Sequence, residues 1–138
     1  MMIQYKQLGS EQMERIKEIY RGEEWYAYLG DDEKLKRAFD NSLYTLGAFA
    51  EGRLVGLIRC VGDGEHIVLV QDLIIDKDYQ KKGIGTELFT RIWNKYAHVR
   101  MFHVVTDLTD EVDNHFYRSF GMKPLVEGNM ISYHRVRI

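Results

Sequence analysis

Apolar residues recur along the chain with two spacings, and each spacing predicts a different kind of element. Alternating or almost continuously apolar runs predict strands at residues 2–8, in both halves of 43–63, at 66–75, at 99–107 and near 129–137. Apolar residues three or four positions apart predict four helices, which follow Ser10, Asp31 or Asp32, the glycine pair at 83–85, and Thr109. Their expected inner faces are Met13, Ile16, Ile19 and Tyr20; Leu35, Ala38 and Phe39; Ile84, Leu88, Ile92 and Tyr96; and Val112, Phe116, Ser119 and Phe120.

The order of these elements predicts an α/β fold of the α+β type. Glu51-Gly52 separates two β-rich runs, as in a hairpin. The run 66–75 is apolar on both faces, which indicates a central strand, and the helix after it leads to the strand at 99–107 through one crossover connection. We therefore expect a single domain over residues 1–138, with a mostly antiparallel mixed sheet and helices on both faces.

Composition and charge narrow the classes of function. The 138 residues are 45% hydrophobic and 29% charged, with a net charge of −2, and no basic stripe with interleaved aromatic residues indicates nucleic-acid binding. The chain shows no signal-peptide pattern and no apolar stretch of the roughly 20 residues that a membrane span needs. Cys60 is the only cysteine, which excludes an internal disulfide and a cysteine-only metal site. We expect a cytoplasmic protein without a metal.

The sequence QKKGIG, residues 80–85, joins an apolar strand to a helix through two glycines. The first amides of a helix have no intrahelical partner, and Gly83 and Gly85 would let a phosphate approach them closely beside Lys81 and Lys82. The alternative is a tight turn flanked by a solvated basic pair, and spacing alone does not decide between the two. The segment is neither a Walker A loop nor a dinucleotide fingerprint, because Gly-Lys-Ser/Thr is missing and Leu88 stands where the last glycine would be.

QKKGIG resembles the Gln/Arg-x-x-Gly-x-Gly/Ala pyrophosphate motif of the GCN5-related N-acetyltransferases, the GNAT superfamily. Downstream, NHFYRSFGMKPL, which begins at Asn114, resembles the second signature of that family, Phe-Tyr-x-x-x-Gly-Phe, with Met122 in place of the final Phe. The likeness covers about residues 43–125, whereas the first 42 residues match only as two helices after a strand. The resemblance implies a GNAT-like fold and acetyl-CoA as the acetyl donor.

The resemblance also implies which residues bind the cofactor. The turn would hold the pyrophosphate, and the backbone of the preceding strand would pair with the two amides of pantetheine. The family often has an Asn six residues before the signature Phe, where Asp110 stands, so whether Asp110 or Asn114 contacts pantetheine stays open. The expected set is Leu73, Ile74, Ile75, Gln80, Lys81, Lys82, Gly83, Ile84, Gly85, Thr86, Asn114, Phe116 and Tyr117.

Acetyl transfer to an amine needs a neutral nucleophile and a proton donor for the departing thiolate. The resemblance gives Tyr117 the role of that general acid. Asp72 is the candidate base, because an acid inside an apolar strand is costly unless it is paired or catalytic. The alternative is a structural role, in which Asp72 bonds groups of a loop or of a neighbouring strand, or pairs with Arg59. Gln71 could position a water, and Cys60 is a poor candidate for a nucleophile because buried structural cysteine is the commoner case.

The segment EEWYAYLGDD, residues 23–32, is the expected acceptor site. Trp25, Tyr26 and Tyr28 among four acids would suit a cationic amine with an apolar body; the alternative is that Trp25 packs on the core and the acids are solvated. The first hypothesis is thus an N-acetyltransferase that modifies a primary amine, of a small molecule rather than a protein, by direct attack in a ternary complex. The alternative is a catalytically idle acyl-CoA-binding or sensing module. A homodimer through the β-rich C-terminal end is a further expectation.

Overall fold

The computed structural model describes residues 2–137. The chain divides into two compact units, residues 1–104 and residues 105–138. The single-domain organisation stays a prediction.

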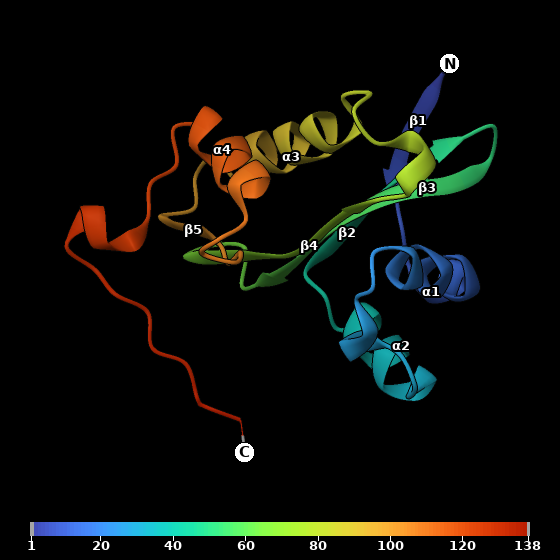
Figure 1. Ribbon diagram of the computed structural model, residues 1–138, viewed down its shortest axis with the longest axis horizontal. Coiled ribbons are helices and arrows are strands. Elements are labelled where there is room, and N and C mark those ends of the chain that lie inside the picture. Colours follow the sequence, from blue (N-terminus) through green and yellow to red (C-terminus); the bar gives the residue numbers. More distant parts are fainter. Residues whose placement is uncertain (1, 138) are drawn as a thin grey trace. The chain divides into compact units, whose positions relative to one another are not determined.

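The first unit contains five strands and three α-helices (Figure 1). The strands are β1 (Ile3–Gln7), β2 (Tyr44–Ala50), β3 (Arg53–Gly62), β4 (Ile67–Ile75) and β5 (Met101–Val104). The helices are α1 (Met13–Gly22), α2 (Asp32–Asp40) and α3 (Ile84–Lys95), and short 3-10 turns lie at Ser10–Gln12, Tyr26–Tyr28 and Lys77–Tyr79. Each element predicted for residues 2–107 is present, with ends shifted by a few residues, and the strand at 99–107 shrinks to the four residues of β5.

The strands form one mixed sheet in the order β1-β2-β3-β4-β5. The first three pairings are antiparallel, and β5 runs parallel to β4 because α3 carries the chain across between them. Glu51 and Gly52 both have positive φ, 50° and 81°, which matches the primed turns that close two-residue hairpins. The predicted hairpin, the central position of β4 and the crossover are all confirmed.

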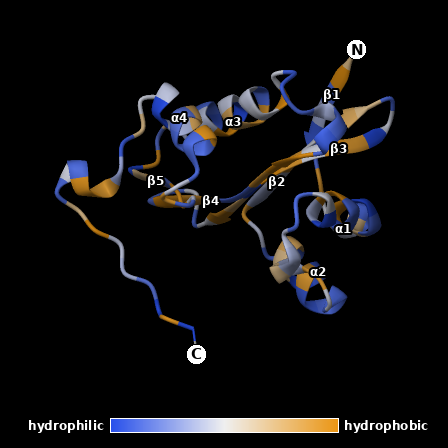
Figure 2. Cartoon of the chain, viewed as in Figure 1, coloured by the Kyte–Doolittle hydropathy of each residue, from blue (hydrophilic) through white to orange (hydrophobic). Residues whose placement is uncertain are grey.

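Helices cover both faces of this sheet, as predicted. Figure 1 shows α1 and α2 on one side of the strands and α3 on the other. On the first side the buried core contains the following side chains: Ile16, Ile19, Tyr20, Leu35, Phe39, Phe49, Leu57 and Ile74. On the other side α3 contributes Ile84, Leu88, Phe89 and Ile92. The central strands of Figure 2 are coloured largely as apolar, which agrees with their burial between two layers of helices.

The second unit contains α4 (Glu111–Ser119) and the short 3-10 helix η4 (Leu125–Gly128). Asp110 caps α4 by accepting a hydrogen bond from the amide of Asp113 at 2.9 Å, and Gly121 has the left-handed φ of 84° expected just after a helix.

Two predictions for this unit are wrong. No strand is present near 129–137 among the residues that the structure describes, because a strand-like sequence forms a strand only when a neighbouring strand pairs with it. The inner face of α4 is also shifted, since Val112 is 79% exposed and Ser119 is exposed as well. Asp113, Phe116 and Tyr117 are partly buried, and Asp113 accepts a hydrogen bond from Thr106 at 3.0 Å.

Candidate active site

A left-handed turn leads the chain from β4 into α3. Lys81 and Gly83 have φ values of 61° and 83°, and Gly83 is the residue that caps α3. The first intrahelical hydrogen bond of α3 runs from the amide of Glu87 to the carbonyl of Gly83 at 3.0 Å. The amides of Ile84, Gly85 and Thr86 therefore point beyond the helix end, where helix geometry favours an anion.

Gly85 has no structural reason to be glycine in the described chain. Its φ is not in the left-handed region, and an added Cβ would lie 3.8 Å from Cγ1 of Ile75, which is an ordinary contact. An added Cβ at Gly83 would meet no described atom within 4 Å, although its positive φ does favour glycine. The tight-turn interpretation thus accounts for Gly83 and leaves Gly85 unexplained.

The side chain of Gln80 connects the start of this turn to the end of β4 by a hydrogen bond. Its side-chain amide donates to the carbonyl of Ile75 at 2.9 Å and to Oε1 of Glu23 at 2.6 Å. Gln80, Lys81 and Lys82 are exposed, so the two lysines lie free to meet an anion at the helix end. The carbonyl of Ile75 already accepts one hydrogen bond and keeps one lone pair for another donor.

β4 extends beyond its last partner on β5. The parallel pairing ends at Val70 with Val104, whereas β4 continues to Ile75. In the described part of the first unit, no strand lies beside Gln71–Ile75 on the β5 edge, and this edge leads directly to the turn at Gln80–Gly85. An extended ligand with amide groups could pair there as an added strand.

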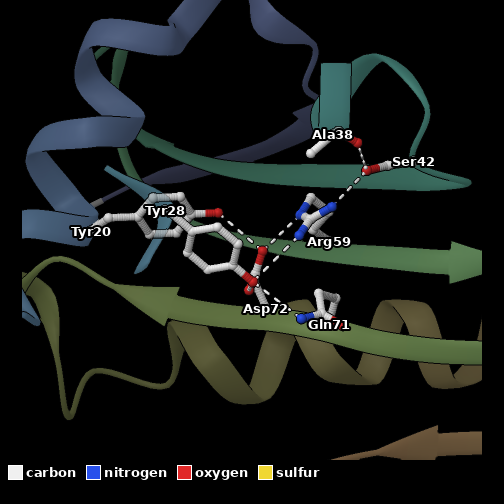
Figure 3. A network of polar contacts seen from close by, with 7 residues as sticks. All are labelled: Tyr20, Tyr28, Ala38, Ser42, Arg59, Gln71 and Asp72. Carbon is white, nitrogen blue, oxygen red and sulfur yellow. Dashed lines mark hydrogen bonds and ion pairs between the residues drawn. The ribbon is translucent and has the colours of Figure 1, made fainter. Parts of the chain in front are cut away.

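A bulge in β4 brings two neighbouring polar side chains to one place. Arg59 pairs with Asp72 while Cys60 pairs with Val70, so Gln71 is the extra residue in the ladder. Without the bulge, Gln71 and Asp72 would point to opposite faces of the sheet. Here both reach the hydroxyl of Tyr28, which donates to Asp72 at 2.6 Å and accepts from Gln71 at 3.2 Å (Figure 3).

Asp72 forms a buried ion pair with Arg59. The carboxylate is 2% exposed and the guanidinium residue 5%, and Nε of Arg59 lies 2.7 Å from Oδ2 of Asp72. The Tyr20 hydroxyl donates to the same oxygen at 3.0 Å, and Arg59 also donates to Ser42 at 3.2 Å. Figure 3 shows these groups converging on the carboxylate from α1, the loop after it and β3. The structural alternative for Asp72, pairing with Arg59, is confirmed.

The two tyrosines of this network resist ionisation. Burial raises the pKa of Tyr20 and of Tyr28, and the negative charge of Asp72 raises both further. Tyr28 therefore stays a hydrogen-bond donor to Asp72 at every physiological pH. Sequence reasoning placed Tyr28 in the acceptor segment but missed its link to Asp72; an acid in an apolar strand was the available signal that some donor had to reach it.

The other predicted acceptor residues differ in their surroundings. Trp25 stacks on Tyr20 with ring centroids 5.7 Å apart and packs against the core, which confirms the alternative reading of that residue. Tyr26 is 60% exposed and Gln71 is exposed. The structure thus brings Gln71 and Tyr28 together beside Trp25 and leaves the Tyr26 ring at the surface.

Cys60 lies in the middle of β3 and is fully buried. Burial raises the pKa of its thiol to about 12, so the thiolate needed for nucleophilic attack is scarce at neutral pH. Among residues 2–137 no group of three His, Cys, Asp or Glu side chains is arranged to hold a metal. None of the described helices is both long and apolar enough to cross a membrane.

Tyr117 lies on α4 in the second unit, next to Phe116, whose ring is 5.2 Å away in an edge-on arrangement. Burial raises the pKa of Tyr117, and the carboxylates of Asp113 and Asp110 add to the rise. The phenol is therefore protonated across the neutral range.

Asp110 and Asn114 both organise the start of α4. The carboxylate of Asp110 is used by the helix cap, and Nδ2 of Asn114 donates to the carbonyls of Asp110 and Asp107 at 2.7 and 3.0 Å. These bonds give each residue a structural role within the unit. Contact of Asn114 with pantetheine stays a prediction.

The strand order, the extension of β4 beyond the end of its pairing with β5 and the glycine turn at the start of α3 are the features of an acetyltransferase type of fold. The model of the acetyltransferase (GNAT) family matches residues 7–122, and the chain belongs to this family.

Relatives and solved structures agree with this assignment. The chain is 30% identical over 104 residues to the "Uncharacterized N-acetyltransferase ycf52-like" of Prochlorococcus marinus, a match that covers 72% of this chain and 57% of the relative. The chain spans about half the length of the curated relatives it matches. A GNAT-family acetyltransferase from Streptococcus pneumoniae TIGR4 is 31% identical, with a TM-score of 0.83 over 99% of this chain and 98% of the other. The PaiA N-acetyltransferase of Thermoplasma acidophilum, solved with coenzyme A, has the same fold at 22% identity, with a TM-score of 0.73 over 89% and 91% of the two chains.

Proposed function

We propose that this protein transfers the acetyl group of acetyl-CoA to a primary amine of a small molecule. The observation that carries the proposal is the free edge of β4 over Gln71–Ile75, which leads into the helix end at Ile84–Thr86. Pantetheine is an extended chain with two amides and ends in a pyrophosphate, so it suits an unpaired strand edge followed by unpaired helix amides. The fold shared with a coenzyme A complex supports the same donor.

The donor site consists of two stretches of backbone in the first unit. The main chain of Leu73, Ile74 and Ile75 would pair with pantetheine, with the Ile75 carbonyl shared with Gln80. The turn from Gln80 to Thr86 would hold the pyrophosphate, with Lys81 and Lys82 adding positive charge. From the second unit, Asn114, Phe116 and Tyr117 are proposed to border the cofactor.

On the acceptor side we propose that Tyr28 and Gln71 meet the amine or a water bound to it. An amine with a pKa near 10.4 is neutral in only about one molecule in 10³ at pH 7, so polar groups that bind the neutral form assist attack. Asp72 accepts hydrogen bonds from Tyr20, Tyr28 and Arg59, and its carboxylate is buried. Asp72 is therefore proposed as a positioning residue that holds the Tyr28 hydroxyl, rather than as a base that touches the amine. Trp25 and Tyr26 would supply the apolar and aromatic surroundings.

The chemistry is a direct transfer. The amine nitrogen attacks the thioester carbonyl, the carbon–sulfur bond breaks, and the Tyr117 phenol donates a hydrogen bond or its proton to the departing thiolate. The proton of the amine passes to water, and solvent returns a proton to the phenol or to the thiolate, so that the products are the N-acetyl amine and the CoA thiol. The proposal needs no metal, nucleic acid or membrane. A single buried cysteine is consistent with a reducing compartment such as the cytoplasm.

The test is release of free CoA thiol from acetyl-CoA across a panel of small primary amines and a lysine-containing peptide. We expect thiol release that depends on a small amine and forms the N-acetyl product in equal amount. Binding of acetyl-CoA without release for any amine would favour the alternative, an idle acyl-CoA-binding module. Absence of binding would contradict both.

Replacing Gly85 with Val tests the phosphate site. The added side chain should hold the pyrophosphate away from the amides of α3, and loss of one charged hydrogen bond costs about 1.5–3 kcal/mol, or about a 10- to 100-fold loss of acetyl-CoA affinity. Calorimetric titration measures the affinity, and circular dichroism checks the fold. Asn94→Val, which places the same side chain at an exposed position of the same helix, is the control and should bind normally. Unchanged affinity in a folded Gly85→Val protein would remove the turn from the site.

Replacing Lys81 with Ala should have a smaller and salt-dependent effect. Lys81 is exposed, so its attraction to a phosphate is worth no more than about 1 kcal/mol, which is less than about fivefold in affinity. Titrations at low and high ionic strength should show the difference from the native protein shrinking as salt rises. A loss that salt does not change would mean that Lys81 acts through the fold of the turn instead.

A further inference from the structure

The hydroxyl of Tyr28 has only one hydrogen, and Asp72 accepts it. The Tyr28 oxygen lies 2.6 Å from Oδ1 of Asp72, and a carboxylate paired with Arg59 can only accept. The two other polar groups that contact the Tyr28 oxygen in the described chain are donors. These are the side-chain nitrogen of Gln71 at 3.2 Å and Nη2 of Arg59 at 3.5 Å. The Tyr28 oxygen therefore acts toward Gln71 as an acceptor only.

This direction of hydrogen bonding determines which end of the Gln71 amide faces Tyr28. If the amide were turned over, its carbonyl oxygen would meet the lone pairs of the Tyr28 oxygen, so only the NH₂ end fits there. Figure 3 shows the nitrogen of Gln71 directed at Tyr28. The side chain is exposed, and Oε1 of Gln71 accepts no hydrogen bond from any described residue. The sheet thus presents a carbonyl oxygen to a ligand beside the acceptor segment.

Gln71 stands at the start of the free edge of β4. The turn proposed to hold the pyrophosphate follows the other end of this edge, so a pantetheine arm paired with Leu73–Ile75 leads toward Gln71 and brings the thioester to that end. The uncharged amide of Gln71 can bind an N–H group without favouring the charged form of an amine. A carboxylate at the same place would raise the pKa of the amine and make the neutral nucleophile scarcer.

We propose, on the basis of the acetyl transfer proposed above, that Gln71 selects primary over secondary amines and that Tyr28 is the positioning residue that holds its amide. A neutral primary amine has two hydrogens on its nitrogen. One donates to Oε1 of Gln71 throughout the reaction, and the other leaves to water after the nitrogen has attacked the thioester, because an amide oxygen accepts hydrogen bonds but is not a base. A secondary amine has a single hydrogen, which must leave, so Gln71 cannot hold it through the whole reaction.

Two matched acceptors test the selection: the most active primary amine of the panel above and its N-methyl derivative. The nitrogen becomes positive as it attacks, so the hydrogen bond to Gln71 is charge-assisted, and its loss corresponds to about a 10- to 100-fold change. Gln71→Met should lower kcat/KM by this factor for the primary amine and by much less for its derivative, with acetyl-CoA affinity unchanged. Gln4→Met makes the same replacement at an exposed position of β1 and should keep the native preference. An unchanged preference in Gln71→Met overturns the proposal.

Tyr28→Phe tests the positioning role. The variant keeps the ring, which stacks on Tyr20 with centroids 4.8 Å apart, and removes the hydroxyl. If Tyr28 acts through Gln71, Tyr28→Phe should reduce the preference for the primary amine in the native background and change it no further in Gln71→Met. Effects of the two replacements that multiply would show that Tyr28 acts independently of Gln71.

Nuclear magnetic resonance tests the fixed amide without any turnover. We expect the side-chain nitrogen of Gln71 to have a higher order parameter than that of the exposed Gln4, and the difference to disappear in Tyr28→Phe. A Gln71 amide as mobile as that of Gln4 in the native protein overturns the proposal. Absence of transfer to both amines by the native protein would instead contradict the proposed function and with it the selection, while the order parameters would still decide whether Tyr28 holds the amide.

Discussion

Replacing Asp72 with Asn is expected to lower the free energy of unfolding by about 3–5 kcal/mol, because Arg59 would then be a buried charge without a counterion. The nitrogen and oxygen of this pair lie 2.7 Å apart and both side chains are at most 5% exposed, so water screens the pair little. Tyr20 and Arg59 donate to Oδ2 of Asp72 and Tyr28 donates to Oδ1, whereas Asn keeps only one acceptor oxygen. The loss therefore includes the removed charge and one hydrogen-bond site that changes from acceptor to donor. Urea unfolding followed by tryptophan fluorescence measures it. Since small domains are stable by only about 5–15 kcal/mol, a large fraction of the total would be lost.

The chain offers a matched control on its surface. Asp40 pairs with Lys36 at 2.8 Å, almost the same distance, but both side chains are well exposed. Asp40→Asn should leave the free energy of unfolding close to that of the native protein, because water and salt screen an exposed pair. Similar losses in the two variants would mean that burial does not set the strength of the Asp72 pair. The double replacement Arg59→Met with Asp72→Leu should recover much of the stability, because it removes both charges together.

The Asp72→Asn variant also distinguishes a positioning role of Asp72 from a catalytic one. If Asp72 only holds the Tyr28 hydroxyl, Asp72→Asn should weaken turnover at a temperature where the variant is folded and keep the acidic limb of its pH–rate profile. A flattened acidic limb with normal stability would instead identify Asp72 as the base that takes the proton of the amine.

The main lines of the fold could be predicted from the sequence because the relevant signals are local. Glu51-Gly52 permits positive φ at both turn positions, and the apolar run of β4 followed by Gly83 and Gly85 leaves few alternatives to a buried strand that enters a helix. The segment 129–137 shows the limit of this reasoning. Its composition predicts a strand, but a strand exists only with a partner, and propensity does not say where that partner is.

The candidate site depends more on long-range geometry, and less of it could be predicted. The register change that places Gln71 and Asp72 on one side is invisible in the apolar pattern, because alternation predicts opposite faces. The ion pair of Asp72 with Arg59 could be stated only as an alternative, since it depends on the register between β3 and β4. Tyr28 lies 44 residues from Asp72, and only the folded chain shows that its hydroxyl lies 2.6 Å from the carboxylate.

Replacing Tyr117 with Phe is expected to lower kcat by roughly 10- to 10³-fold, with little change in acetyl-CoA affinity, because it removes only the hydroxyl that would stabilise the departing thiolate. Proton transfer from a phenol with a pKa near 10 to a thiolate whose thiol has a pKa near 8.5 costs roughly 2 kcal/mol. In this protein burial raises the pKa of Tyr117, and Asp113 and Asp110 raise it further, so complete transfer is less favourable still. Much of the effect should therefore come from a hydrogen bond to the developing charge, with the proton arriving later or from solvent.

The raised pKa of Tyr117 also determines how kcat should depend on pH. A phenol whose pKa lies above its ordinary value of 10 stays protonated through the neutral and mildly alkaline range, so loss of the Tyr117 proton should not reduce kcat below about pH 10. The comparison is made in single-turnover experiments, where product release does not mask the chemical step. Tyr133→Phe, which removes the same hydroxyl from an exposed tyrosine of the same unit, is the control and should keep its rate. A Tyr117→Phe protein that transfers acetyl groups as fast as the native one in a single turnover would leave Tyr117 without a catalytic role.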